Sequence, residues 1–124
     1  MMYYTSEHEW LKMMDETTAR VGITDHAQAQ LGDIVFVDYT ASIGEIAKGE
    51  EVVTVESVKS VSDVYAPVSG TITAFNDTLA DRPETVNESA ITEGWMFEME
   101  LSDLSELKSL LSLEQYEALL EEEE

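Results

Sequence analysis

Apolar and polar positions alternate in short segments along the chain up to residue 101. Such period-two alternation is typical of half-buried β-strands, and it is clearest at residues 70–75. Residues 51–55 and 61–65 are rich in β-branched side chains, which also favour strands. Further short strands are expected at residues 3–5, 10–14, 17–23, 33–39 and 94–101. The chain is therefore predicted to be mainly β.

Two segments differ from this alternation. Residues 33–39 are the most apolar of the predicted strands, and we expect them to form a central strand. Residues 76–90 are mostly polar and include Pro83 and Asn87, so we expect them to form the longest loop.

Helical periodicity is predicted at two places. Thr24 can cap a short helix over residues 25–31 that ends at Gly32. Leucines on one helical face predict a tail over about 102–120 that packs on the strands, and we expect residues 121–124 to form a frayed acidic end. Two pairs in the tail have capping-box spacing: Asp103 with Glu106, and Ser112 with Gln115.

Length and element order together predict the architecture. A chain of 124 residues is of single-domain size, so residues 1–124 are expected to form one domain with its core at about 1–101. Many short strands followed by a helical tail favour a small β-sandwich or flattened barrel, with one short internal helix.

The net charge of the chain limits the classes of partner that we expect. The sequence has 27 acidic and 6 basic residues, a formal net charge of -21. Such a surface repels nucleic acid and anionic membranes and favours partners with basic docking surfaces. No apolar run is long enough to span a membrane, and the start of the chain does not resemble a signal peptide. We expect a cytoplasmic protein of bacterial type, or a mitochondrial matrix protein only if a transit peptide has been removed.

The residue types in the sequence do not favour a catalytic role. With no cysteine and only two histidines, His8 and His26, neither a thiolate nucleophile nor a zinc site is expected. Lys59 lies between two predicted strands, at an exposed hairpin tip with small neighbours. Such a tip offers no pocket to lower the lysine pKa from about 10.4, so we do not expect catalysis by its amine. A long, solvent-facing amine suits a covalently tethered group instead.

The sequence around Lys59 is specific enough to be compared with known families. Residues 56–63 and 65–70 resemble the lipoyl-attachment hairpin of the glycine cleavage system H-protein family. The blocks at residues 7–10, 21–28, 31–37, 86–88 and 93–95 match that family in order and spacing, while residues 81–85 and 89–92 depart from its usual wording. Biotinyl domains carry a Met-Lys-Met tip and acyltransferase lipoyl domains an Asp-Lys-Ala tip, and neither is present. The attachment motif comprises Glu56, Ser57, Val58, Ser60 and Asp63 around Lys59.

This resemblance implies a lipoyl-domain-like β-sandwich that acts as a carrier and not as an enzyme. Lys59 would hold lipoate as N6-lipoyl-lysine, attached by a lipoate ligase or lipoyltransferase. The arm would take the aminomethyl group of glycine from glycine decarboxylase, a pyridoxal phosphate enzyme, to aminomethyltransferase. Dihydrolipoamide dehydrogenase would then reoxidise it.

The resemblance also implies a cleft that protects the loaded arm, at positions matching Glu9, His26 and Asp63. Carboxylates there could hold an aminomethyl ammonium through charge-assisted hydrogen bonds. Each of the three could instead be structural: Glu9 and Asp63 as solvated acids, and His26 as a helix-packing residue. His8 and Trp10 are expected to be structural.

Two other functions remain open at this stage. The first is an H-like lipoate donor that relays lipoyl groups to other enzymes' carrier domains, because its attachment sequence would look the same. The second is an unmodified interaction domain whose acidic face binds a basic partner.

Overall fold

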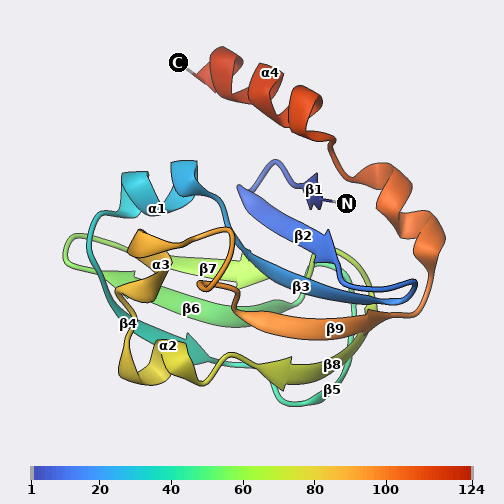
Figure 1. The fold of residues 1–124 in the computed structure, drawn as a ribbon, viewed down its shortest axis with the longest axis horizontal. Coiled ribbons are helices and arrows are strands. Elements are labelled where there is room, and N and C mark those ends of the chain that lie inside the picture. Colours follow the sequence, from blue (N-terminus) through green and yellow to red (C-terminus); the bar gives the residue numbers. More distant parts are fainter. Residues whose placement is uncertain (1, 124) are drawn as a thin grey trace.

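The strands form two separate sheets that share one core, as Figure 1 shows for a computed structural model that describes residues 2–123. Within those residues the larger sheet has six strands and the smaller has three, and all neighbouring strands are antiparallel. The larger sheet runs in the order β1 (Met2–Tyr4), β2 (Glu9–Met13), β3 (Thr18–Ile23), β9 (Phe97–Leu101), β8 (Gly70–Phe75) and β5 (Gly44–Ile46). The smaller runs β4 (Ile34–Tyr39), β6 (Glu51–Ser57) and β7 (Val61–Tyr65). The predicted mainly-β sandwich is confirmed, and the sheets do not close into a barrel.

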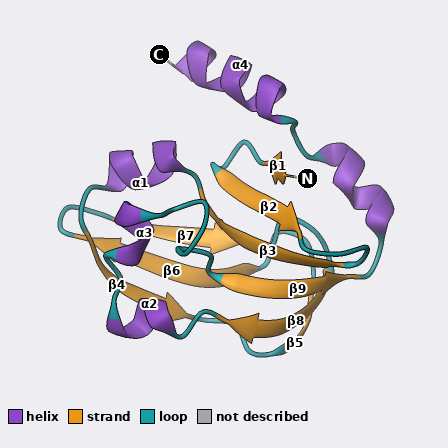
Figure 2. Cartoon of the chain, in the orientation of Figure 1, coloured by secondary structure: helices purple, strands orange, loops and turns teal. Residues whose placement is uncertain are grey.

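The core lies between the two sheets. Val53 and Val55 of β6 are fully buried, as are Val21 of β3, Ile72 of β8 and Phe97 of β9. These residues alternate with polar ones along their strands, which is the pattern expected of strands with one buried face. Figure 2 shows the helices at the periphery of this strand framework.

The internal helix forms as predicted. Helix α1 covers Asp25–Leu31, and the Thr24 side chain accepts a hydrogen bond from the backbone N–H of Ala27 at 3.3 Å. Gly32 ends the helix with φ of 82°, and its N–H donates to the Gln28 carbonyl. Only glycine adopts such a conformation readily, so this residue sets where the chain turns towards β4.

The prediction that residues 33–39 form a central strand is wrong. β4 is an edge strand of the smaller sheet, and β6 is its centre. A register shift between Ile34 and Phe36 interrupts the alternation of β4. Ile34 and Val37 point into the core, whereas Val35 and Phe36 are exposed. A bulge of this kind turns apolar residues outward while the segment stays just as apolar in sequence. Apolar content alone therefore led to the wrong prediction for this strand.

The expected long loop at residues 76–90 also needs correction, because it contains two short helices. These are α2 (Thr78–Asp81) and α3 (Thr85–Glu88), which bury Leu79 and Val86. Each spans only four residues, which is too few to show a 3.6-residue period against a polar background.

The tail is helical and packs on the sandwich, as predicted. It consists of a 3₁₀ helix, η1 (Leu104–Ser109), and α4 (Leu113–Glu123), separated by a short extended segment. Ser112 and Gln115 form the predicted capping box, in which each side chain accepts a hydrogen bond from the other's backbone N–H. α4 extends three residues beyond the expected boundary at residue 120, and Glu124 of the expected frayed end lies outside the described residues.

The tail buries one face over the N-terminal strands. Tyr116 of α4 stacks on Tyr4 of β1 with ring centroids 4.9 Å apart, and both join Trp10 in a second apolar cluster. Trp10 is buried and donates its indole N–H to the Ala90 carbonyl at 2.9 Å. Two backbone hydrogen bonds between Tyr4 and Leu111 fix the start of α4 to β1.

Candidate functional site

Lys59 lies at the exposed tip of the hairpin that joins β6 and β7. Ser57 organises this turn: its hydroxyl accepts hydrogen bonds from the backbone N–H groups of Lys59 (3.3 Å) and Ser60 (3.0 Å). Its own N–H donates to the Ser60 carbonyl at 2.8 Å. The tip therefore has a defined backbone although its side chains face solvent.

The tip rests on the segment that follows α1. The backbone N–H of Val58 donates to the Asp33 carbonyl at 3.0 Å. The Lys59 side chain lies over Gly32, where its Cε would be 3.3 Å from a Cβ added at that position. Gly32 thus ends α1 and also leaves room for the methylene stem of Lys59.

Asn87 of α3 holds this segment in place. Its Oδ1 accepts from the Ile34 N–H at 2.8 Å, and its Nδ2 donates to the Gly32 carbonyl and to Gln28 Oε1, each at 2.9 Å. A single side chain therefore connects the end of α1 to the start of β4. It lies within the family-like block at residues 86–88, but the sequence pattern did not indicate this role.

A cavity of about 340 Å³ lies next to the hairpin. Ile23, Ala27 and Leu31 line it on one side and Val55 and Val64 on another. Two of the three residues expected in the cleft, Glu9 and Asp63, line this cavity. The third, His26, is not among the described residues that line it, whereas Glu7 and His8 are.

Glu9 is the buried acid of this site, with 3% of its side chain exposed. Its Oε2 accepts from the Tyr65 backbone N–H at 2.7 Å, and its Oε1 accepts from the Thr5 hydroxyl at 3.3 Å. Burial raises the pKa of Glu9 from 4.5 to about 7, although both hydrogen bonds favour the ionised form. The residue can therefore gain or lose a proton near neutral pH.

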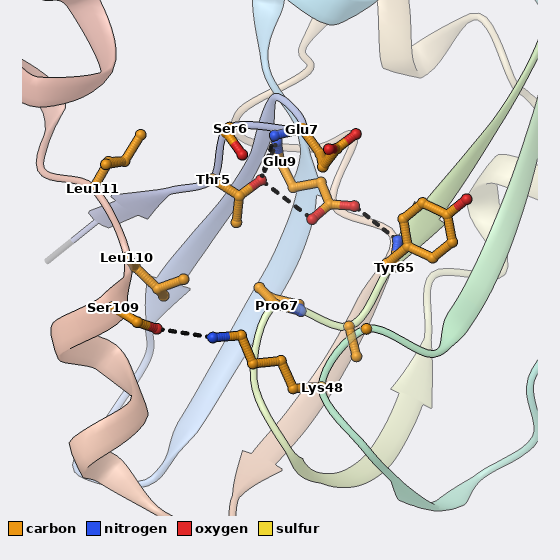
Figure 3. A pocket seen from close by; sticks show the side chains of 12 residues that line it. Thr5, Ser6, Glu7, Glu9, Lys48, Tyr65, Pro67, Ser109, Leu110 and Leu111 are labelled. Atoms are coloured by element: carbon orange, nitrogen blue, oxygen red, sulfur yellow. Dashed lines mark hydrogen bonds between the residues drawn. The ribbon is translucent and has the colours of Figure 1, made fainter. Parts of the chain in front are cut away.

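Glu9 also lines a second, larger cavity, shown in Figure 3. This cavity measures about 530 Å³ and lies between the loop after β1, the segment around Tyr65 and the part of the tail between η1 and α4. Lys48 spans part of it and donates to the Ser109 hydroxyl at 3.0 Å. Glu9 thus forms part of the wall between the two cavities.

Asp63 is exposed, in contrast to Glu9. Its Oδ1 accepts a hydrogen bond from the Thr54 hydroxyl at 3.0 Å. A hydrogen bond to the Asp63 carboxylate favours the protonated form of the neighbouring Glu51 and so raises the pKa of Glu51. Asp63 therefore borders the cavity while its carboxylate interacts with the adjacent strand.

The two histidines lie together between α1 and the tail. Their ring centroids are 4.6 Å apart, and His8 Nδ1 lies 2.8 Å from the Tyr116 hydroxyl. That hydroxyl is 2.7 Å from the Thr24 hydroxyl. His26 Nε2 is buried and has no hydrogen-bond partner among the described residues. His8, which was expected to be structural, both lines the smaller cavity and contacts Tyr116, and its φ of 66° could not be foreseen from sequence.

In the part of the chain from residue 2 to residue 123, no cluster of three or more acidic, histidine or cysteine side chains is arranged to hold a metal ion. In the same part of the chain, no helix has the length and apolarity needed to cross a membrane.

Three comparisons with known proteins all point to the same family. A family model described as "Glycine cleavage H-protein" matches residues 2–123. The glycine cleavage system H proteins of Salmonella typhimurium and Escherichia coli K12 are each 52% identical over 120 residues, which is 97% of this chain and 93% of theirs. A crystal structure of a glycine cleavage system H protein from Mycobacterium marinum superposes with a TM-score of 0.85 at 33% identity, covering 97% of this chain and 96% of that one.

Proposed function

The chain belongs to the glycine cleavage H-protein family and is a lipoyl carrier of the glycine cleavage system, and on this premise we propose that Lys59 is the residue that carries lipoate. One observation supports this assignment most strongly. The exposed Lys59 lies at an ordered hairpin tip beside a cavity of about 340 Å³. Attachment through an amide bond removes the lysine charge and lengthens the side chain.

The residues present fit such a group. The stem of Lys59 lies over Gly32, and Ala27 and Leu31 of the preceding helix line the cavity. An apolar chain attached to Lys59 and placed in the cavity would contact these aliphatic side chains, and Glu9 would supply a buried carboxylate. When bound, the dithiolane supplies a pair of sulfur atoms that can be oxidised, reduced and loaded with cargo.

Glu9 has the central polar role in this proposal. In its ionised form it accepts charge-assisted hydrogen bonds from an aminomethyl cargo, which carries an ammonium group. A bound cation favours the ionised form, so binding shifts the Glu9 pKa downward from about 7. Asp63 adds a negative charge at the cavity border. His26 contacts His8, which lines the cavity.

Membership of the glycine cleavage system implies partners within that system. We propose that these are glycine decarboxylase, aminomethyltransferase and dihydrolipoamide dehydrogenase, with a lipoate ligase or lipoyltransferase attaching the arm in the cytoplasm. The chain itself is a carrier, and the chemistry of each step belongs to the partner enzymes.

Intact-mass and peptide-mass measurements after treatment with lipoate and a lipoate ligase test the attachment site. The wild type should gain one lipoyl group, located on Lys59. Lys59→Arg should gain none and should not support glycine–bicarbonate exchange by the decarboxylase. Lys108→Arg, which changes another exposed lysine, is the matched control and should behave as the wild type. Modification at a different lysine would refute the assignment.

A further inference from the structure

Large apolar side chains are exposed around the tip of the hairpin. Val58 and Val61 expose 68% and 61% of their surface, and Val35 and Phe36 at the start of β4 expose 52% and 47%. Other exposed apolar residues, such as Ile43 and Leu113, lie in a loop before β5 and at the start of α4. The apolar surface near Lys59 is therefore a local cluster.

Strand register places two of these residues in one row. Phe36 of β4 pairs with Glu56 of β6, and Glu56 pairs with Val61 of β7. Side chains of directly paired residues point to the same face of a sheet. Phe36 and Val61 therefore flank Glu56 on the solvent face of the smaller sheet. We call this row, together with Val35 and Val58, the outer sheet face.

Carboxylates surround the outer sheet face. The next row consists of Asp38, Thr54 and Asp63, and the hydrogen bond from Thr54 to Asp63 confirms that these side chains share one face. The sequence has no lysine or arginine at residues 21–47, 49–58 or 60–81, so β4, β6 and β7 contain none. Lys59 lies at the tip between β6 and β7, and acylation removes its charge.

We propose that the outer sheet face is the docking surface for the enzyme that acylates Lys59, and that this enzyme presents an apolar centre bordered by lysine or arginine. The inference rests on Lys59 being the attachment residue. Charge complementarity favours such a partner, because the acidic border would be repelled by an acidic surface and attracted by a basic one. The exposed Phe36 and Val61 side chains supply the part of the interface that excludes water.

The short length of the unmodified lysine side chain favours the acylating enzyme as the partner, and not the enzymes that use the finished arm. An unmodified lysine has only four methylene groups, and the attached acyl chain roughly doubles its length. The acylating enzyme must bring an activated acyl donor to the amine nitrogen, where the new amide bond forms, the donor's acyl bond breaks and one proton leaves the amine. Its surface must therefore approach the hairpin tip closely, whereas an enzyme that receives the finished arm can remain farther away.

Threonine substitutions test the proposal, because threonine keeps β-branching and strand propensity while removing apolar surface. Phe36→Thr with Val61→Thr forms the test variant, and Ile43→Thr with Leu113→Thr the matched control. Lipoylation by a purified ligase is followed by intact mass at several protein concentrations and at two salt concentrations. Thermal unfolding confirms that each variant is folded.

The test variant should lose about tenfold or more in kcat/KM for lipoylation, mainly through KM, while the control stays within about twofold of the wild type. Wild-type kcat/KM should fall as salt rises. Once lipoylated to completion, the test variant should be used by dihydrolipoamide dehydrogenase at the wild-type rate. Equal kcat/KM for test and control variants would overturn the proposal, as would equal slowing of the dehydrogenase. Wild-type protein that is never modified on Lys59 would instead refute the proposed function.

Discussion

The Glu9 carboxylate accepts a hydrogen bond from the backbone N–H of Tyr65 at 2.7 Å. This contact joins β2 of the larger sheet to the end of β7 in the smaller one. It places a titratable buried group of β2 against the end of the strand that follows Lys59, between the two cavities. The proton on Glu9 therefore affects both the stability of the fold and the polarity of the cavity.

Glu9→Gln should change how stability depends on pH. Burial raises the folded pKa to about 7, whereas the unfolded chain has the ordinary value of 4.5. Between these values the folded state binds more protons, so stability falls as pH rises through this window. Glutamine does not titrate and retains an oxygen to accept from Tyr65. Relative to the wild type, the variant should gain roughly 2 kcal/mol between pH 5.5 and pH 8.

Urea unfolding at a series of pH values measures this difference. Glu7→Gln is the matched control, because Glu7 is an exposed carboxylate two residues away. Glu9 remains in this variant, so its stability should still fall as pH rises through the window. A Glu9→Gln curve that falls in the same way would contradict the raised pKa.

Asn87→Ala should loosen the support of the hairpin tip. It leaves the Ile34 N–H and the Gly32 carbonyl without their partner, at a cost of about 2–3 kcal/mol in unfolding free energy. Amide exchange at Val58, which donates to the Asp33 carbonyl, should become faster in the native state. Gln28→Ala removes only one of the Asn87 contacts and should cost less than about 1 kcal/mol. Unchanged exchange at Val58 would show that Asn87 does not position the tip.

Gly32→Ala and Gly49→Ala separate backbone strain from contact with the lysine. Both glycines have positive φ, 82° and 91°, so each substitution should cost roughly 1–3 kcal/mol. Only at Gly32 would the added Cβ contact Lys59 Cε, whereas nothing lies within 4 Å at Gly49. The NMR shifts of the Lys59 ε-methylene should therefore move in the first variant and stay fixed in the second. Equal shifts in both would indicate that the stem does not rest on Gly32.

Tyr116→Phe should weaken the attachment of α4. The ring can still stack on Tyr4, but the hydroxyl contacts with His8 and Thr24 are lost. We expect a loss of about 1–2 kcal/mol and faster amide exchange in α4. Tyr65→Phe, which removes a tyrosine hydroxyl elsewhere, is the control and should leave α4 exchange unchanged. If α4 exchange is also unchanged in Tyr116→Phe, stacking alone holds the helix.

Local signals predicted the elements that are defined within a few residues. Thr24 and Gly32 delimit α1, and the pairing of Ser112 with Gln115 begins α4 because both capping groups lie within one turn. The hairpin around Lys59 was predicted for the same reason, since two β-branched strands flank a three-residue tip.

Features that depend on distant partners were missed. β4 is an edge strand with a bulge at Val35, and an apolar run reveals neither feature. The cavity combines residues from β2, β3, α1, β6 and β7, so its exact lining depends on tertiary structure. His8, which has a left-handed backbone just before β2, lines the cavity, whereas His26 is not among the described residues that do.

The contacts between the tail and β1 have a consequence for the order of folding. Tyr116 meets His8 across a separation of 108 residues, and Tyr4 pairs with Leu111. Closing a loop of this length is slow compared with forming the neighbouring hairpins. During synthesis the sandwich strands can pair before the tail has left the ribosome, while Tyr4 remains uncovered. Docking of α4 is therefore expected to be the final step, and the segment most exposed to proteases in a nascent chain should be the one that it covers.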